Sequence, residues 1–456
     1  MTEASAPAPR GASISDGSAV TVPLVSDAYR RYALVVLLLV YTVNFLDRQV
    51  VTILAEPIKN DLHIADWQIG LMTGFAFALF YTVLGLPIAR LAESFNRIWI
   101  IGGSLTVWSG FTILCGQAGS FAQLVAARIG VGIGEAGCTP TSHSLIADYV
   151  PKDKRASALA FFSIGTPLGG LLGLAMGGVI ADLYGWRTAF LLAGLPGLIL
   201  TLVVMTTMRE PRKQLSADAA ARHAPGKGHF AATLKYLATK KAFWFIAFAA
   251  AIKAFVGYGH APFTASFFFR NHAEEVAQLA AIFHLKSAGF MGLALGLMGG
   301  TAGIISSWVG GWIADQAAKR DLRAYMSVPA VASVLSPIFF VVAMLADSAA
   351  VALLVLLLPG LLGSLWYGPV YASAQGLVPL HMRATSASIL LFIINMVGLG
   401  LGPLFVGILS DTLAGPVGLG SAEGVRWALI LSSLLGVVAF GLFWMARRTI
   451  REEMVS

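Results

Sequence analysis

Two short polar stretches, residues 89–97 (ARLAESFNR) and residues 311–319 (GWIADQAAK), share one pattern and lie 222 positions apart. Each begins with a small residue, then has any residue, an aliphatic residue, an alanine and an acid, with a base four positions after the acid. Each also follows a long apolar run. One such acid–base pair can recur by chance, so the interpretation depends on whether other segments repeat as well.

A second pair of motifs repeats at nearly the same distance. Val-Pro at 150–151 precedes Arg155, and Val-Pro at 378–379 precedes Arg383, 228 positions later. Two matched motifs at nearly one offset indicate two homologous halves. Repeated halves of matching topology are how many transporters build a central site at their interface.

The composition predicts a membrane protein. Of the 456 residues, 57% are hydrophobic and 12% are charged, with a mean hydropathy of +0.77; soluble domains carry about 25% charged residues. A bilayer-spanning helix needs about 20 mostly apolar residues. Twelve stretches qualify: 32–58, 67–92, 98–118, 121–149, 156–183, 188–208, 242–270, 284–316, 325–346, 350–378, 384–410 and 425–446. We therefore predict an all-α integral membrane protein with twelve transmembrane helices in two six-helix bundles.

One long polar segment lies between the sixth and seventh apolar stretches and divides the chain. The first residues are rich in Ala, Ser, Pro and Gly, which is typical of a flexible tail. We expect the following organisation: a disordered cytoplasmic tail at 1–29, a first bundle at 30–208, a cytoplasmic linker at 209–241, a second bundle at 242–447 and a cytoplasmic tail at 448–456.

The distribution of Lys and Arg predicts the orientation. With the N-terminus inside, 23 of the 31 basic residues fall in inner segments and 5 in outer ones, which agrees with the excess of positive charge in cytoplasmic loops. We expect a multi-pass protein of the inner cell membrane with both termini cytoplasmic. The net charge of +8 is then a topology signal, so we expect membrane lipids and no nucleic acid as partners, and a monomer.

Motifs of enzymes and metal sites are absent from the sequence. It contains no His-Glu-x-x-His, no Gly-x-Ser-x-Gly, no clustered Cys and His and no Walker-type phosphate loop, the motifs of metalloproteases, serine hydrolases and ATPases. We expect no enzymatic activity, no metal and no cofactor. ATP is accordingly not expected as the energy source.

Five ionisable residues fall in the middle of predicted helices: Asp47, Arg48, Arg128, Glu135 and Lys253. Each costs about 2.5–3.5 kcal/mol at the bilayer centre on insertion scales, so these side chains must face an aqueous cavity or one another. We expect Arg48, Arg128, Glu135 and Lys253 to bind substrate, and Asp47 or Glu135 to carry a coupling proton. The alternative is a buried ion network that only fixes helix packing.

Helical spacing refines this expectation. Arg128 and Glu135 are seven residues apart, so they share one face at a separation of roughly 10 Å along the axis and can contact different parts of one ligand. Asp47 and Arg48 point about 100° apart. We expect one of them to face the cavity while the other braces a neighbouring helix.

The two acid–base loops resemble the signature loop of the major facilitator superfamily. More narrowly, residues 44–48 (NFLDR) resemble a stretch in helix 1 of the spinster-type lysolipid transporters, and residues 128–136 (RIGVGIGEA), followed by Ile-Ala-Asp at 146–148, resemble their helix 4. The first loop departs from the family, because Glu93-Ser94 stands where the family usually shows Asp-Arg.

The superfamily resemblance implies a gate. In that superfamily, the loop acid of one half caps a helix of the other half when the cytoplasmic side is closed. We expect Asp315 to meet the start of helix 5 near Arg155, and Glu93 to meet the start of helix 11 near Arg383. The expected gating residues are Glu93, Arg97, Arg155, Asp315, Lys319 and Arg383.

The cargo follows from the intramembrane charges. Three cations outnumber two acids, and a planar guanidinium suits phosphate oxygens, whereas few amides are present in the spans to bind a sugar. We expect a proton-coupled secondary transporter, working by alternating access, for an amphiphilic anion. Its headgroup would lie near Arg128 and its tail along the Phe-rich face of helix 7, around Phe263, Phe267, Phe268 and Phe269. The spinster resemblance implies lysophospholipid or sphingosine-1-phosphate-like lipids; the alternatives are a small organic acid and a drug-type efflux carrier.

Overall fold

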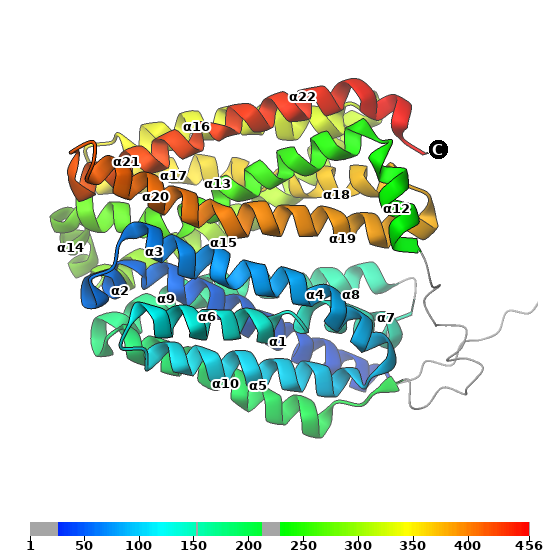
Figure 1. Cartoon of the computed structure of the whole chain (residues 1–456), viewed down its shortest axis with the longest axis horizontal. Coiled ribbons are helices and arrows are strands. Elements are labelled where there is room, and N and C mark those ends of the chain that lie inside the picture. Colours follow the sequence, from blue (N-terminus) through cyan, green and yellow to red (C-terminus); the bar gives the residue numbers. More distant parts are fainter. Residues whose placement is uncertain (1–25, 152–153, 212–228, 456) are drawn as a thin grey trace, which may run out of the picture.

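The computed structural model describes residues 26–151, 154–211 and 229–455, which contain helices and no strands. Long helices run side by side in two groups, one from each half of the chain (Figure 1). The predicted all-α architecture of two bundles is confirmed. The described parts that flank the linker and the C-terminus lie at one end of the bundles (Figure 1); we call it the termini end, and the other the opposite end.

The first bundle is formed by eleven helical segments among the described residues. They are α1 (Asp27–Ile53), α2 (Ala55–Leu62), α3 (Asp66–Gly70), η1 (Leu71–Phe75), α4 (Ala76–Ser94), α5 (Arg97–Gly116), α6 (Phe121–Glu135), α7 (Cys138–Tyr149), α8 (Arg155–Ser163), α9 (Gly165–Tyr184) and, completing the bundle, α10 (Trp186–Thr207). Helix α3 continues through the π-helical turn η1 into α4 as one long element.

The second bundle is formed by the segments that follow residue 228. Its segments are α12 (His229–Ala238), α13 (Lys241–Asn271), α14 (Ala273–Ile282), α15 (Ser287–Ala318), α16 (Ala324–Met344), α17 (Ala349–Gly363), α18 (Tyr367–Gly376), η4 (Leu380–Met382), α19 (Arg383–Ile393), η5 (Ile394–Leu401), α20 (Gly402–Ala414), α21 (Gly420–Ser433) and α22 (Leu435–Glu453). A π-helical segment, η5, interrupts the eleventh span, between α19 and α20, as η1 interrupts the second span, between α3 and α4.

Eleven elements among the described residues are long and apolar enough to cross a membrane. The expected span 121–149 is the one that this criterion does not detect, because it is divided between α6, with 15 residues, and α7, with 12. The helix is interrupted around Gly137, where a β-carbon would collide with the hydroxyl of Ser104 on α5. The close approach of α5 explains why a glycine is needed there.

Some element ends differ from the sequence-based expectation. Helix α1 begins at Asp27, inside the expected tail, because the Ser26 hydroxyl caps it by accepting from the N–H of Tyr29 at 3.3 Å. Helix α12 lies within the expected linker. Helix α22 continues past residue 447 to Glu453, whose carboxylate accepts from the N–H of Ala242 at 3.1 Å. This contact ties the chain end to α13.

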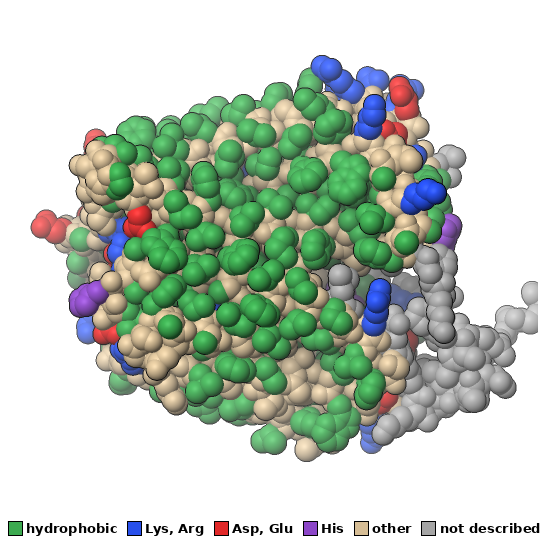
Figure 2. Space-filling model, viewed as in Figure 1, with side chains coloured by type: hydrophobic (Ala, Val, Ile, Leu, Met, Phe, Trp, Pro, Cys, Tyr) green, Lys and Arg blue, Asp and Glu red, His purple; other side chains and the backbone are tan. Residues whose placement is uncertain are grey.

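The two halves meet closely at the opposite end. A β-carbon on Gly178 of α9 would collide with the carbonyl oxygen of Ala288 on α15, and one on Gly292 of α15 would collide with that of Leu174. The distance between these two helices increases toward the termini end. Beyond it, the surface is hollowed between the halves at the right-hand side of Figure 2. The bundles are therefore closed at the opposite end and open toward the termini end.

Apolar side chains cover the visible length of the bundles, and charged side chains gather at the two ends (Figure 2). Exposed side chains such as Trp308, Leu354 and Leu202 are 67–71% accessible. A soluble protein rarely exposes such a continuous apolar surface. Contact with lipid accounts for it.

Candidate functional site

Helices α1 and α6 bring together an ion pair in the middle of the first bundle. The Nε of Arg48 lies 2.6 Å from Oε2 of Glu135. The Glu135 side chain is fully buried, whereas that of Arg48 is 14% exposed. Of the two side chains, only that of Arg48 is therefore partly accessible to solvent.

Aromatic rings surround the guanidinium of Arg48. Its central carbon lies 5.2 Å from the ring centre of Phe45, 5.0 Å from that of Phe77 and 4.4 Å from that of Tyr81. The guanidinium of Arg128 lies 5.1 Å from the same Phe77 ring, so this ring contacts both cations. Cation–π contacts contribute about 0.5–2 kcal/mol each, so these rings stabilise both guanidinium groups in their positions.

Asp47 and Arg48 contact different neighbours, as their spacing predicts. The carboxylate of Asp47 is fully buried and its Oδ2 accepts from the hydroxyl of Thr112 on α5 at 3.1 Å. Its Oδ1 has no hydrogen-bond partner among the described residues. Arg48 instead contacts Glu135 on α6 and the rings of α4. Asp47 thus braces α5, and Arg48 faces the centre.

Arg128 is a buried cation whose hydrogen bonds remain unused. The residue is 1% exposed and makes no hydrogen bond or ion pair to the described residues. Next to Arg48, both amide atoms of Asn44 are also buried and unpartnered, as is Oε1 of Glu135. Buried polar groups are normally satisfied. The site therefore has both hydrogen-bond donors and hydrogen-bond acceptors without a partner among the described residues.

Glycines set the position of α6. A β-carbon on Gly130 would collide with the ring of Phe111, one on Gly134 with the backbone of Trp108, and both of these residues belong to α5. The close approach of α5 places Arg128 and Glu135 where α1 can contact them. The glycine-rich run in this helix is thus explained by helix packing.

Tyrosines from both halves gather near Arg48. Tyr41, Tyr258 and Arg48 lie within electrostatic range of Tyr81, and Tyr371 on α18 lies within range of Tyr41, Tyr81 and Tyr258. None of these tyrosines was expected to be functional from the sequence. Phe77 and Tyr81 were detectable as aromatic residues four positions apart on one helix face; the tyrosines of the second half carried no comparable signal.

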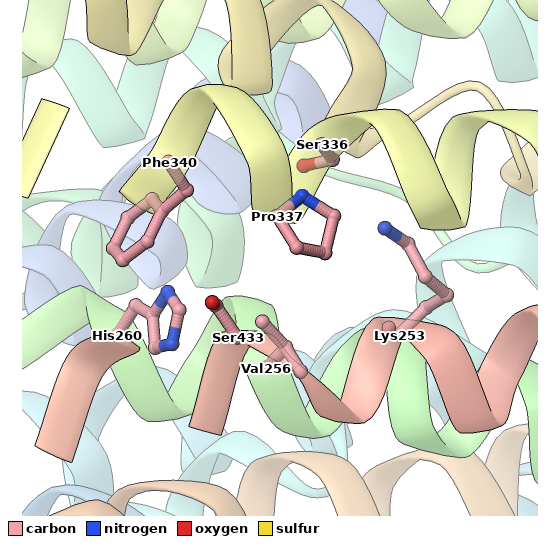
Figure 3. A pocket seen from close by; sticks show the side chains of 8 residues that line it. Lys253, Val256, His260, Ser336, Pro337, Phe340 and Ser433 are labelled. Atoms are coloured by element: carbon pink, nitrogen blue, oxygen red, sulfur yellow. The ribbon is translucent and has the colours of Figure 1, made fainter. Parts of the chain in front are cut away.

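Lys253 does not belong to this site, which corrects the sequence-based expectation. It lines a separate small cavity within the second half, together with His260 and side chains of α16, α21 and α22 (Figure 3). The side chain leaves α13 on a different face from Tyr258, whose neighbours are Arg48 and Tyr81. Helical rotation thus separates Lys253 from the other four intramembrane charges.

The phenylalanines of helix 7 do not form a groove. Phe263, Phe267 and Phe268 of α13 are fully buried, and Phe269 is half-buried. The ring of Phe267 also lies 5.7 Å from the guanidinium of Arg426. The alternative interpretation, that these rings serve packing, is the one that fits the structure.

Arg97 belongs to a buried ion network inside the first half and does not reach the second. Its Nη1 lies 2.6 Å from Asp148, its guanidinium contacts Glu210, and its backbone N–H donates to Glu210 at 2.8 Å. The side chain of Arg97 is fully buried. These contacts fix α5 against α7 and the end of α10, so the expected gating role is not seen.

The other expected gating residues do not contact the opposite half in this conformation, where the structure describes their side chains. Asp315 accepts from the hydroxyl of Tyr325 at 2.9 Å, Arg155 donates to the carbonyl of Val150 at 3.1 Å, and Lys319 contacts its own helix. Arg383 begins α19. The side chain of Glu93 lies outside the described residues. Because the termini end is open, the expected contacts remain a prediction for the closed state.

A different set of contacts closes the opposite end. Arg270 at the end of α13 contacts Glu56 at 2.7 Å and Asp66 at 2.8 Å, both in the first half. Asp182 accepts from backbone N–H groups of α15, and Asp411 from those of α3. The expected spans 156–183 and 384–410 end near these two acids, but the sequence did not show what the acids bind.

Comparison with known proteins places these observations in a family. The model of the Major Facilitator Superfamily matches residues 37–403. An MFS-type efflux pump of Mycolicibacterium smegmatis is 32% identical over 92% of this chain and 93% of its own. Protein spinster homolog 1 of Xenopus tropicalis is 25% identical over 92% and 81%. The crystal structure of a bacterial homologue of the human lysosomal transporter Spinster, inward-facing and unoccupied, matches with a TM-score of 0.85 and 30% identity, covering 95% and 100% of the two chains.

Proposed function

This chain belongs to the Major Facilitator Superfamily, and from that premise we propose that it is a proton-coupled secondary transporter of an amphiphilic anion. It works by alternating access in the inner cell membrane, with the termini end cytoplasmic. The cargo is a lysophospholipid or a sphingosine-1-phosphate-like lipid. Family membership makes the chain a membrane transport protein and not an enzyme; the cargo, the proton and the orientation are the proposal.

The observation that carries the proposal is a pair of guanidinium groups, those of the partly exposed Arg48 and the buried Arg128, which both contact the ring of Phe77. Arg48 has one carboxylate partner and Arg128 has none. A phosphate headgroup accepts bidentate hydrogen bonds from guanidinium groups. The surrounding aromatic rings supply an apolar boundary for the part of the lipid tail next to the headgroup. An amphiphile with one anionic end matches this distribution of charge.

The geometry also supports a way to couple proton and anion. Glu135 and the headgroup of the cargo compete for Arg48, because both are anionic and the guanidinium is the accessible member of the pair. A proton on Glu135 would release Arg48 to the cargo. A proton on Asp47, which has no ion-pair partner within 4 Å, would instead raise the net positive charge beside Arg128. Either carboxyl can link proton uptake to anion binding.

Binding measured with matched lipids tests the cargo. Arg128→Ala is expected to weaken binding of a lysophospholipid or phosphorylated sphingoid base far more than binding of its dephosphorylated partner. Each methylene removed from the chain is expected to weaken binding by about 0.8 kcal/mol where it is buried. Arg31→Ala, on the exposed start of α1, is the matched control. If affinity is independent of chain length and a short carboxylate competes fully, the cargo is a small organic acid.

A drug-type efflux carrier is the second candidate. It is supported by the similarity to the M. smegmatis efflux pump and by the tyrosines near Arg48, because aromatic faces attract lipophilic cations. Competition distinguishes the two cargoes. A lipophilic cation that displaces a bound lysophospholipid, and whose binding Arg128→Ala leaves intact or strengthens, favours efflux of drugs over transport of lipids.

A further inference from the structure

A small cavity lies inside the second half, away from the site at α1 and α6. Its volume is about 40 Å³, and it is bounded by α13, α16, α21 and α22 (Figure 3). A buried water needs about 10–15 Å³ on this measure, so the cavity has room for about three water-sized particles. The lining residues are Lys253, Val256, His260, Ser336, Pro337, Phe340, Ser433 and Gly436.

Lys253 supplies the only charged side chain in this lining. It is 8% exposed and makes no hydrogen bond or ion pair to the described residues. In Figure 3 its amine extends from α13 toward Ser336 and Pro337 of α16. No Asp or Glu is among the lining residues. A buried ammonium without a counter-charge costs several kcal/mol, and an anion in the cavity would supply the counter-charge that the lining lacks.

The other polar groups in the lining are largely committed to protein partners. Ser433 donates to the carbonyl of Ile430 at 2.6 Å. His260 Nε2 lies 3.0 Å from the hydroxyl of Ser432, which itself donates to Ala428 at 2.7 Å, so the imidazole is the donor in that contact. Lys253 and the hydroxyl of Ser336 are left to donate into the cavity.

We propose that this cavity is a binding site for a small monovalent inorganic anion of halide size, held by the ammonium of Lys253 and the hydroxyl of Ser336. The apolar walls of Val256, Pro337 and Phe340 suit a weakly hydrated ion. A lipid headgroup with its chain exceeds the available volume, so the ligand is not the proposed cargo. Because the whole lining belongs to the second half, occupancy does not require the halves to move.

Thermal unfolding of the purified full-length protein in detergent tests this site. When chloride replaces gluconate at constant ionic strength, the melting temperature of the wild type is expected to rise and to saturate, because a ligand bound only by the folded state stabilises it. Lys253→Met keeps the length of the side chain and removes its charge, so it is expected to abolish the dependence on chloride. Lys235→Met, on the exposed face of α12, is expected to retain it.

Diffraction from wild-type crystals soaked in bromide gives a second measurement that does not depend on any variant. An anomalous peak within hydrogen-bond distance of Lys253 Nζ is expected. Equal melting temperatures in chloride and gluconate with no bromide peak would overturn the proposal, as would a chloride dependence that persists in Lys253→Met. These readouts involve no lipid and no proton gradient, so their failure is distinguishable from failure of the proposed transport function.

Discussion

Asp182, in the last turn of α9, accepts a hydrogen bond of 2.6 Å from the backbone N–H of Gly289, in the first turn of α15. The two residues belong to different halves. Asp411 makes the equivalent contact in the other direction, accepting from the N–H of Trp67 at 2.7 Å. Each acid thus lies at a helix N-terminus, which carries about half a positive charge. Two related contacts close the opposite end of the molecule.

Removing the charge of both acids should open that end. A carboxylate at a helix N-terminus contributes about 0.3–1 kcal/mol, so Asp182→Asn combined with Asp411→Asn should shift the equilibrium toward the state open at the opposite end by roughly 3- to 30-fold. Double electron–electron resonance distances across that end should lengthen. Asp61→Asn, an exposed acid paired with Arg187 of its own half, should leave them unchanged; distances equal to wild type in the double variant contradict the assignment.

Two glycines offer a steric test of the same closure. Gly178→Ala and Gly292→Ala each place a β-carbon against a carbonyl oxygen of the other half, that of Ala288 or Leu174. Both variants should disfavour closure at the opposite end and slow transport. Gly170→Ala, on the same helix as Gly178, meets no atom within 4 Å and should transport at the wild-type rate. Equal rates in all three variants would mean that this approach of the halves is not part of the cycle.

The gate expected at the termini end predicts the opposite shift. Glu93→Gln combined with Asp315→Asn should weaken the closed state of that end and lengthen distances measured across it by electron resonance. Tyr325 holds Asp315 in the present conformation, so Tyr325→Phe should release the acid and shorten the same distances. If neither variant changes the distances, closure of the termini end uses other contacts.

The coupling proton can be assigned by comparing two carboxyl variants in proteoliposomes. If Asp47 carries the proton, Asp47→Asn should abolish gradient-driven uptake while sparing exchange and binding. Glu135→Gln should in either case raise affinity for the anionic cargo, because Arg48 loses its carboxylate partner. Gradient-dependent uptake that persists in Asp47→Asn but is lost in Glu135→Gln assigns the proton to Glu135. Unchanged proton dependence in both variants would remove both carboxyls from the coupling.

The buried network around Arg97 predicts a loss of stability rather than a gating effect. Glu210→Gln removes one partner of a fully buried guanidinium, and breaking such pairs costs about 3–5 kcal/mol; Asp148 remains, so we expect the lower end. Glu423→Gln, in a partly exposed pair with Arg426, should cost about 0–1 kcal/mol. Unfolding free energies in detergent give both values. A shift of conformational distances without loss of stability would return Arg97 to the gate.

The sequence of each segment by itself was enough to predict the membrane spans, the two halves and the intramembrane charged residues. Hydropathy over about 20 residues is a property of the segment itself, since every apolar helix must cover the bilayer whatever its neighbours are. Intramembrane charge is costly, so all five intramembrane charges were expected to face a cavity or one another, and the structure places four of them, Asp47, Arg48, Arg128 and Glu135, near one another. Helical spacing alone also predicted that Asp47 and Arg48 would reach different neighbours.

Only the tertiary structure determined which charged residues contact one another. Lys253, like Asp47, Arg48, Arg128 and Glu135, lies in the middle of a membrane-spanning helix. It nevertheless faces a separate cavity, because packing against other helices sets the rotation of α13 about its axis. Packing between helices also explains why Arg97, which lies next to a gate-like loop, contacts Asp148 and Glu210 instead of the other half. Asp182 could be recognised from the sequence as lying near a helix end, but not as the cap of α15. Distances between residues far apart in the sequence depend on how closely two helix backbones approach, which glycines permit. Hydropathy and spacing describe one segment only, so they contain no information about the segment against which it packs.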